Sequence, residues 1–346
     1  MGGPALAVAE VRRAVRPFVA ALRRDPPYDV PHAGHDRVMV ACSGGADSLA
    51  LAAAVSFEAA RAGVPAGLIT VDHGLQRGSA ERADLVAAIG YEMGLDPVEV
   101  VRVAVGRAGG PEAAARTARY AALAATAGAL DAQVMLGHTL DDQAETVLLG
   151  LGRGSGPRSI AGMAAVDGRY LRPLLGLRRE TTAAACSALG LPVWTDPHNS
   201  DAAFQRARLR HEVLPLLDGV LQGGVAEALA RTAALLRDDL DALDVMAADA
   251  LLRVVRPRPG DEPGKHGQSM EELDVASVAS LPRALRTRVL RLWVATAGAA
   301  PLTAERTEAV DALVSDWHGQ GPIDLPGRVA VHRASGRLVL TAEPQE

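Results

Sequence analysis

A short glycine-containing stretch has the residue types and spacing best suited to chemistry in this chain. It consists of Ser43, Gly44, Gly45, Ala46, Asp47 and Ser48. Apolar residues precede it and an Ala/Leu-rich run follows, which predicts a strand, a turn and a helix start. Glycines let a phosphate approach the backbone, and helix N-termini attract anions. A Walker loop is excluded because Lys265 is the only lysine. We predict a compact phosphate-binding turn, with an ordinary capped turn as the alternative.

A second polar pair follows the next apolar run, which spans residues 67–71. Asp72 and His73 come directly after it. Ligands of open α/β sheets bind at the carboxyl ends of the strands. These two side chains are therefore predicted to meet a nucleotide. The alternative is a turn aspartate beside a histidine in solvent.

Two arginines share one face of a predicted helix that begins near Glu112. Arg116 and Arg119 are three residues apart, and Tyr120 is adjacent. Residues at this spacing lie side by side on a helix, so both guanidinium groups can reach one anion. A solvated charged face explains the spacing equally well.

A third polar cluster follows the apolar run of residues 133–137. His138 lies in the predicted loop, and Asp142 and Glu145 lie one helical turn apart in the helix after it. Two carboxylates and an imidazole can hold a metal ion or bind an ammonium group. Helix capping would explain one aspartate but not the whole cluster.

Arginines are concentrated between residues 150 and 215. This segment has nine arginines against five Asp or Glu, a net charge of +4, whereas the whole chain has −5. A local basic patch of this kind suits a phosphate backbone. The candidate phosphate contacts are Arg153, Arg206, Arg208 and Arg210. Surface solubility is the alternative.

The elements that position these residues alternate between short apolar runs and amphipathic helices. Runs at 37–42, 67–71, 97–105 and 133–137 are predicted strands, and residues 169–175 add a further one. The alternation predicts an α/β fold with a doubly wound parallel sheet in residues 1–217. A second, mainly helical domain with a small β element is expected over 218–346. A helix over 204–217 is expected at the end of the first domain, with the boundary near Pro215, and Pro/Gly-rich residues 256–268 are expected to form a loop.

Composition limits the class of protein. Two cysteines, Cys42 and Cys186, permit neither a disulfide framework nor a cysteine-rich metal site. No signal peptide and no apolar run of membrane-spanning length are apparent. We expect a soluble cytoplasmic protein that does not associate with membranes. The sequence leaves a homodimer open.

These motifs together resemble the PP-loop (N-type ATP pyrophosphatase) superfamily, whose fold is adenine nucleotide alpha-hydrolase-like. Within it, the chain resembles the tRNA(Ile)-lysidine synthetase family over about residues 37–215. The blocks that carry the resemblance are Ser43 to Ser48, Val71 to Leu75, Glu112 with Arg116, Arg119 and Tyr120, Gly137 to Thr146, Arg153 to Gly156, Arg172-Pro-Leu, and Trp194 to His211. Two positions depart from the usual family pattern, His198 and Ala207, so any contact made there is in doubt.

The resemblance implies a reaction and its participants. ATP would adenylate the carbon-2 oxygen of the wobble cytidine in a tRNA(Ile) with a CAU anticodon, and free L-lysine would then displace AMP to give lysidine. It also implies roles for residues. Residues 43–48 would hold pyrophosphate, Asp47 would bind Mg²⁺, and Asp72 and His73 would contact ATP. Arg116 and Arg119 would act with Asp47 in catalysis, by neutralising charge as the adenylate forms.

The remaining implied roles concern lysine and tRNA. Asp142 and Glu145, with His138 nearby, would grip the lysine ammonium groups, and the arginine-rich tail and the second domain would hold tRNA phosphates. Two other functions are considered. A PP-loop tRNA thiolase would need reactive cysteines, and Cys42 and Cys186 both occur in apolar contexts. A nucleotide-binding module without chemistry would need neither the 138–145 cluster nor the arginine tail.

Overall fold

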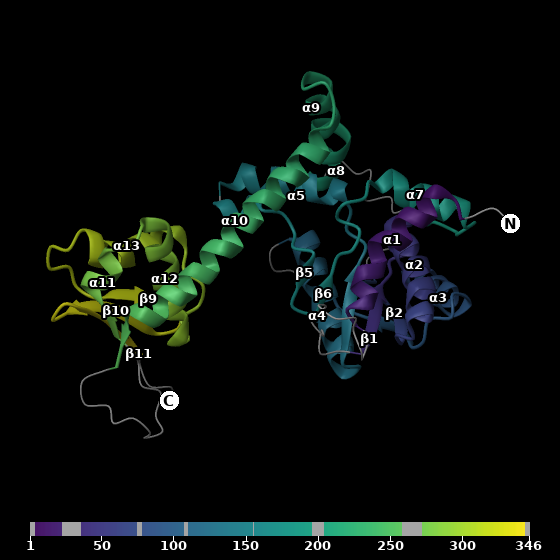
Figure 1. Cartoon of the computed structure of the whole chain (residues 1–346). Coiled ribbons are helices and arrows are strands. Elements are labelled where there is room, and N and C mark those ends of the chain that lie inside the picture. The colour runs from purple at the N-terminus through teal and green to yellow at the C-terminus, as the bar shows by residue number, and fades with distance from the viewer. Residues whose placement is uncertain are drawn as a thin grey trace. The chain divides into compact units, whose positions relative to one another are not determined.

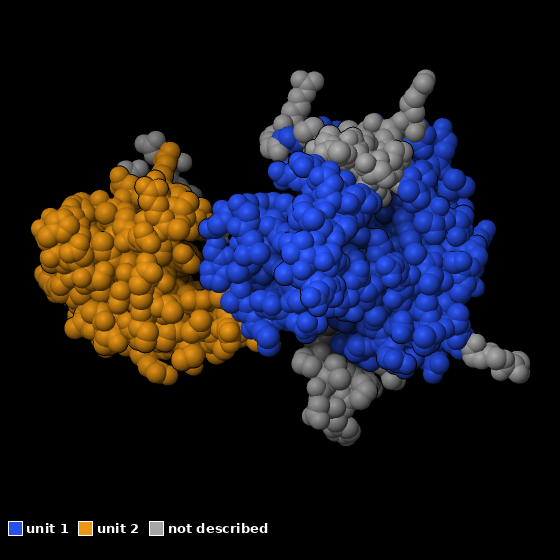
Figure 2. All heavy atoms as spheres, turned by 90° about the horizontal axis from the view of Figure 1, so that it is seen from above, with its two compact units in different colours: residues 1–236 blue, residues 237–346 orange. Residues whose placement is uncertain are grey.

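The computed structural model describes residues 4–22, 36–74, 78–106, 110–154, 156–195, 204–257 and 272–342. The chain divides into two compact units, residues 1–236 and 237–346 (Figure 2). The division falls inside a single long helix, α10 (Val225–Val254). The functional boundary expected after residue 217 stays a prediction.

A six-stranded sheet forms the centre of the first unit (Figure 1). Its strands are β1 (Arg37–Ala41), β2 (Ala66–Asp72), β3 (Val98–Arg102), β4 (Ala132–Leu136), β5 (Val166–Asp167) and β6 (Tyr170–Leu171). They lie in the order β3-β2-β1-β4-β6-β5, and only β5 pairs in antiparallel fashion. The chain moves outward from β1 in one direction and then returns to β4 on the other side of it. This reversal is the switch point at which open α/β sheets bind ligands.

Helices cover both faces of this sheet. They are α1 (Leu6–Ala20), α2 (Ala46–Ala62), α3 (Ser79–Glu92), α4 (Pro111–Ala129), α5 (Leu140–Arg153), α6 (Pro157–Ile160) and α7 (Arg179–Ala188). Successive side chains of a strand point to opposite faces. Val38 and Val40 accordingly pack in a core with α1, α2 and α7, whereas Met39 packs in a second core with α4. The predicted doubly wound α/β fold is confirmed.

The single helix expected over 204–217 is interrupted. The structure has α8 (Gln205–Arg208), a π-helical turn, η2 (Leu209–Val213), and α9 (Leu214–Val220). Pro215 lacks an N–H group and its ring crowds the carbonyl four residues earlier, so regular α-helical hydrogen bonding cannot continue through this point. The predicted helix is therefore present over residues 205–220, with one π-helical turn within it.

The second unit has its own core. Helices α11 (Val275–Ala279), α12 (Arg283–Thr296) and α13 (Ala304–Ser315) pack with the end of α10 around buried Trp293. Strands β7 (Val255–Arg256), β8 (Glu272–Asp274), β9 (Ile323–Leu325), β10 (Val329–Ala334) and β11 (Arg337–Ala342) form a sheet in the order β7-β8-β11-β10-β9. The predicted β element of residues 321–341 thus supplies three strands, and β7 and β8 extend it. Residues 258–268 of the expected loop lie outside the described residues.

No single helix in the described part of the chain has the length and apolarity to cross a membrane. One bent pair, residues 205–220 and 225–254, meets the criterion together, with an angle of 94° between its helices.

Candidate functional site

The glycine turn connects β1 to α2 and leaves the start of α2 open. Gly44 has a φ of +85°, which favours glycine. The Ser48 hydroxyl accepts the Ser43 N–H at 3.2 Å and donates to the Gly45 carbonyl at 2.9 Å, so it closes the turn internally. Gly45 is the N-cap residue and provides no side-chain cap. The first N–H groups of a helix lack intrahelical partners, so this turn can bind an anion such as pyrophosphate.

The end of β4 approaches the glycine turn closely. A Cβ atom on Gly137 would lie 3.0 Å from the Asp47 carbonyl group and 3.1 Å from the Ser48 nitrogen. Only glycine allows this approach. The parallel pairing of β1 with β4 therefore brings the predicted 138–145 cluster beside the predicted phosphate turn.

Three carboxylates from these two motifs surround one guanidinium group. Arg179 Nη2 lies 2.7 Å from Asp142 Oδ1 and 3.6 Å from Glu145 Oε1, and its Nε lies 3.4 Å from Asp47 Oδ2. Thr182 donates a hydrogen bond to the other oxygen of Asp47. Arg179 and Thr182 come from the first turn of α7. The network therefore joins α2, α5 and α7.

Burial and charge act differently on the three carboxyl groups. Burial raises the pKa of Asp47, although Thr182 and Arg179 oppose the rise. Burial likewise raises the pKa of Glu145, opposed by Arg210. Burial also acts to raise the pKa of Asp142, but Arg179 and the Thr139 N–H outweigh it and lower that pKa overall. Asp142 is the carboxylate most firmly held in its charged form.

Two arginines of the tail also approach this carboxylate group. Arg210 Nε lies 2.9 Å from Glu145 Oε1, and Arg206 lies 3.9 Å from the other oxygen of Glu145. Arg210 belongs to the π-helical turn η2 and Arg206 to α8. Glu145 itself is fully buried. Two arginines predicted to contact tRNA thus lie against a carboxylate predicted to contact lysine.

Three arginines, Arg116, Arg119 and Arg172, act electrostatically on His138. Burial lowers the pKa of His138 to about 3, and the charges of Arg119, Arg172 and Arg116 add to the effect, opposed by Asp142. The Nδ1 atom of His138 is buried and has no hydrogen-bond partner among the described residues. The same holds for Arg119 Nε. Arg172 is paired with Asp167 at 3.4 Å, whereas Arg116 and Arg119 add positive charge near His138 that can attract a phosphate.

His73 and Asp72, at the end of β2, differ in their surroundings. Burial and the charge of Arg119 lower the pKa of His73, and its buried Nδ1 is also without a partner in the described part of the chain. Asp72 accepts the Gly74 N–H at 2.9 Å, and a hydrogen bond from Ser79 is the main cause of its lowered pKa. The charge of Arg119 thus acts on His73, whereas Asp72 accepts hydrogen bonds from the turn before α3.

The other predicted contacts lie on the surface. Arg153 is exposed at the end of α5, and exposed Arg208 forms an ion pair with Glu212 at 3.0 Å. Arg116 is exposed and donates to the Tyr120 hydroxyl at 3.3 Å. Ala207, a departure from the family pattern, is buried, so its side chain serves packing. His198 lies outside the described residues.

Sequence reasoning missed Arg179 and Thr182, which contact Asp47 directly. A signal was present, because Arg178 and Arg179 stand side by side where α7 begins. Cations at a helix N-terminus are opposed by the helix dipole. Their presence there indicates nearby anions, although not which anions.

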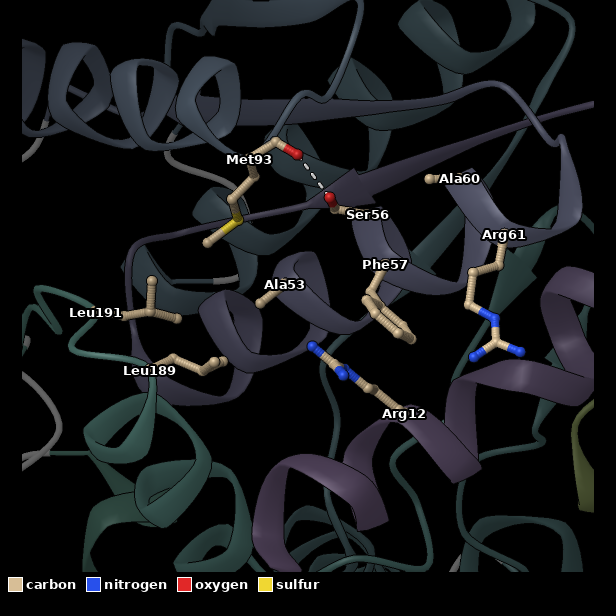
Figure 3. Close-up of a pocket in the computed structure, with 9 residues that line it drawn as sticks. All are labelled: Arg12, Ala53, Ser56, Phe57, Ala60, Arg61, Met93, Leu189 and Leu191. Atoms are coloured by element: carbon tan, nitrogen blue, oxygen red, sulfur yellow. Dashed lines mark hydrogen bonds between the residues drawn. The ribbon is translucent and has the colours of Figure 1, made fainter. Parts of the chain in front are cut away.

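A separate hollow lies away from these clusters (Figure 3). Phe57 of α2 lies between two guanidinium groups, 3.5 Å from that of Arg12 and 5.6 Å from that of Arg61. Ser56 donates to the Met93 carbonyl at 2.6 Å beside it. None of the residues predicted to do chemistry lines this hollow. The candidate site is therefore the region around the glycine turn. No group of three or more His, Cys, Asp or Glu in the described ranges is arranged as a metal site.

Comparison with known proteins agrees with the geometry. The PP-loop domain family matches residues 15–217, and the TilS substrate binding domain family matches residues 273–339. A tRNA(Ile)-lysidine synthase from Thermobifida fusca is 55% identical over 346 residues, which cover 99% of this chain and 100% of that protein. The chain belongs to the tRNA(Ile)-lysidine synthase family. A second member, from Streptomyces coelicolor, is 56% identical over 309 residues, 88% of this chain and 84% of that protein.

The synthase family fold extends to more distant proteins. A U34-tRNA thiolase, NcsA from Methanococcus maripaludis, solved with its [4Fe-4S] cluster, superposes with a TM-score of 0.53. The match covers 67% of this chain and 80% of that one, at 19% identity. At this identity the likeness shows the fold alone. The predicted family and the PP-loop fold are both confirmed.

Proposed function

We propose that this chain is an ATP-dependent ligase that makes lysidine in tRNA(Ile). The carbon-2 oxygen of the wobble cytidine attacks the α-phosphate of ATP, and pyrophosphate leaves. The ε-amine of free lysine then attacks carbon 2, and AMP leaves with the oxygen. The observation that carries this proposal is the similarity to tRNA(Ile)-lysidine synthases over both domains and nearly the whole chain.

The open start of α2 supports a pyrophosphate site at residues 43–48. Four N–H groups of a helix start, together with the helix dipole, favour a bound phosphate. Asp47, in the first turn of α2, is 24% exposed at its side chain, so it remains accessible. Mg²⁺ is usually held by one or two carboxylates together with substrate phosphates, and Asp47 fits that role. The metal would neutralise charge on the triphosphate.

The cations around His138 support a site for the reacting phosphate. Arg116 and Arg119 lie in α4, and His73 at the end of β2 adds a ring nitrogen without a partner in the described residues. We assign Arg116 and Arg119 to stabilising charge on the α-phosphate as the adenylate forms. His138 is neutral at physiological pH because of its low pKa. Its role is therefore to hydrogen-bond a substrate and not to carry a proton.

The carboxylates Asp142 and Glu145 support a site for lysine ammonium groups. Both already contact guanidinium groups, those of Arg179 and Arg210. An incoming ammonium group would have to share these carboxylates with the arginines. The ammonium group could replace the Arg210 guanidinium beside Glu145 without a change in net charge if Arg210 moved to another anion. A phosphate of the tRNA backbone would supply that anion.

We assign tRNA phosphate binding to Arg153, Arg206, Arg208 and Arg210, together with the second unit. Arginine is suited to phosphate contacts because its guanidinium donates two parallel hydrogen bonds. A tRNA substrate also implies a cytoplasmic place of action. Whether two copies associate stays a prediction.

The thiolase alternative lacks support in the cysteines. Cys42 and Cys186 are the only two in the sequence, and both are buried. Burial is the first cause that raises the pKa of Cys186 to about 11, so its thiolate is scarce at neutral pH. A [4Fe–4S] cluster is ordinarily held by four cysteines. Neither a sulfur carrier nor a cluster site can be built from this pair alone.

The test is a labelling experiment with a matched tRNA control. The protein is incubated with ATP, Mg²⁺, radiolabelled lysine and a tRNA(Ile) transcript whose anticodon is CAU. The control transcript differs only at the wobble base, with UAU in place of CAU. Label in the CAU transcript alone, with stoichiometric AMP and pyrophosphate, is the expected result. Equal labelling of both transcripts, or none, would contradict the proposal.

A further inference from the structure

Trp194 connects the chain after α7 to the glycine turn. Its backbone N–H donates to the Gly44 carbonyl at 2.9 Å. Gly44 is buried and its φ is +85°, so the orientation of the peptide after it is not set by ordinary strand or helix geometry. The hydrogen bond from Trp194 can therefore fix the orientation of the peptide group between Gly44 and Gly45.

The direction of the Gly44 carbonyl determines the direction of the Gly45 N–H. The carbonyl and the following N–H of a trans peptide point in opposite directions. Among the described residues the only cis peptide is Asp96–Pro97, so the peptide between Gly44 and Gly45 is trans. Holding the carbonyl toward Trp194 aims the Gly45 N–H away from it. Gly45 is the N-cap residue of α2, where an anion would bind.

The indole of Trp194 is itself held by an arginine. The Arg82 guanidinium lies 3.8 Å from the centre of the indole ring, a cation–π contact. Arg82 belongs to the first turns of α3, and Val86 of the same helix lies against Gly44, 2.9 Å from where a Cβ would be. One side of the glycine turn is thus bounded by α3 and Trp194 together.

The residues beside Trp194 are exposed. Pro192, Val193 and Thr195 are exposed, and Trp194 is absent from the buried residues that form the cores. Leu191 packs against the first core just before it. Within the described residues, Trp194 hydrogen-bonds Gly44 and stacks with Arg82, and it belongs to none of the core clusters, so loss of its ring should leave the core intact.

We propose that Trp194, clamped by Arg82, is a positioning residue that presets the glycine turn for the ATP phosphates. The inference rests on the proposed function, because it assumes that ATP binds at residues 43–48. Trp194 acts through the Gly44 peptide. Arg82 acts through the indole ring.

The test measures ATP affinity in the unmodified protein and in five variants. Trp194→Ala removes the ring, Trp194→Phe keeps an aromatic face, Arg82→Gln removes the cation, and a double variant combines Trp194→Ala with Arg82→Gln. Arg102→Gln is the control, because Arg102 is also near the sheet edge, 3.9 Å from Asp72, but has no contact with Trp194. The measurements are the Kd for a non-hydrolysable ATP analogue, the KM and kcat of pyrophosphate release, and the thermal unfolding midpoint.

Trp194→Ala should raise the Kd and the KM for ATP roughly tenfold while kcat changes less than about twofold, since a misaligned turn mainly weakens binding. Trp194→Phe should restore most of the affinity. Arg82→Gln should weaken binding roughly threefold to tenfold, and should have no further effect in the Trp194→Ala background. Arg102→Gln should bind as the unmodified protein does.

Two results would overturn the inference. One is unchanged ATP affinity in a folded Trp194→Ala variant, and the other is an Arg82→Gln effect that is fully additive. If Trp194→Ala does not fold, equal affinities of Arg82→Gln and Arg102→Gln overturn it instead. Failure of the proposed function looks different: the unmodified protein would then make no lysidine. Normal lysidine synthesis together with unchanged ATP affinities in the variants would contradict the positioning role of Trp194 but not the proposed function.

Discussion

At the scale of residues, the candidate site is a balance between buried charges of opposite sign. Asp47, Asp142 and Glu145 approach one another around Arg179, and Arg210 adds a second cation. Like charges this close are tolerated only because guanidinium groups lie between them. The ion pairs hold the three carboxylates in place. Any substrate that carries charge must disturb it on entry.

Replacing Asp47 tests the phosphate end of this balance. Asp47→Ala should reduce tRNA-dependent pyrophosphate release by roughly a hundredfold or more, because the metal and the triphosphate lose their carboxylate partner. Release is measured with saturating ATP and the CAU transcript. Asp239→Ala, which removes an exposed carboxylate of α10, is the control. A near-normal rate in a folded Asp47→Ala variant would remove this residue from the mechanism.

Neighbouring arginines provide a matched test of the network. Arg179→Met removes the cation that contacts all three carboxylates, leaves Arg210 as the cation nearest Asp142 and Glu145, and should lower the free energy of unfolding by about 3 kcal/mol. Arg178→Met should cost less, about 1 kcal/mol, because Arg178 is 34% exposed and its partners Glu227 and Asp141 are 37% and 14% exposed, so water screens these pairs more. Urea denaturation followed by circular dichroism gives both values. Equal losses would mean that the network contributes no special stability.

His138 predicts how stability depends on pH. Its pKa is about 3 in the folded protein, well below the ordinary value of 6.5. Between these values the unfolded chain binds a proton that the folded protein does not. Stability is therefore present above pH 6.5 and falls on acidification, by up to about 1.4 kcal/mol per pH unit. His138→Gln should flatten this part of the curve. Unfolding free energies measured from pH 7 to pH 5 that are parallel in both proteins would contradict the assignment.

At the scale of elements, the site exists because two strand ends meet at a switch point. β1 leads into the glycine turn and β4 into the 138–145 cluster, and the two strands are parallel neighbours. Parallel pairing places both carboxyl ends at the same edge of the sheet. Helix α7 then supplies Arg179 and Thr182 to both motifs. No single element carries the site.

Two glycines near these elements give opposite predictions. Gly137→Ala would push its Cβ into the Asp47 backbone, so it should destabilise the protein by about 1–3 kcal/mol and suppress pyrophosphate release. Gly152→Ala lies in α5 with open space around it, and should be neutral or stabilise by up to about 1 kcal/mol. Thermal unfolding and the release assay are run on both. Two variants with equal stability and activity would contradict the close approach.

At the scale of the whole molecule, charge is distributed unevenly along the chain. Residues 150–215 carry +4, whereas residues 237–346 have 13 Lys or Arg against 17 Asp or Glu. Four arginines of the second unit form ion pairs with carboxylates, for example Arg286 with Asp311 at 2.6 Å. The electrostatic attraction for tRNA should therefore come mainly from the first unit. The contribution of the second unit should depend less on salt.

Salt dependence tests this division. The logarithm of the tRNA binding constant falls linearly with the logarithm of the salt concentration. Arg153→Gln should make this slope shallower by about 0.7 to 0.9, because one phosphate contact is lost. Arg283→Gln, which removes a second-unit arginine 3.1 Å from Glu308, should leave the slope unchanged. Filter binding between 50 and 200 mM salt, in round numbers, measures both. The reverse order of effects would move the main phosphate contacts to the second unit.

The sequence alone determined the local parts of this protein. The strand, glycine turn and helix start at residues 37–48 follow from backbone preferences of neighbouring residues, and the alternation of strands and helices predicts the doubly wound sheet. The paired residues Asp142 and Glu145 share a helix face for the same local reason. These features need no information from distant parts of the chain.

Only the tertiary structure decided which charges meet. Arg179 reaches Asp47 across 132 residues, and Arg210 reaches Glu145 across 65. Such pairs depend on how α7 and η2 pack against α2 and α5. The spacing of residues along the chain does not predict that packing. Arg210 therefore seemed free for tRNA in the sequence, whereas folding places its guanidinium against a fully buried carboxylate that must have a cation beside it.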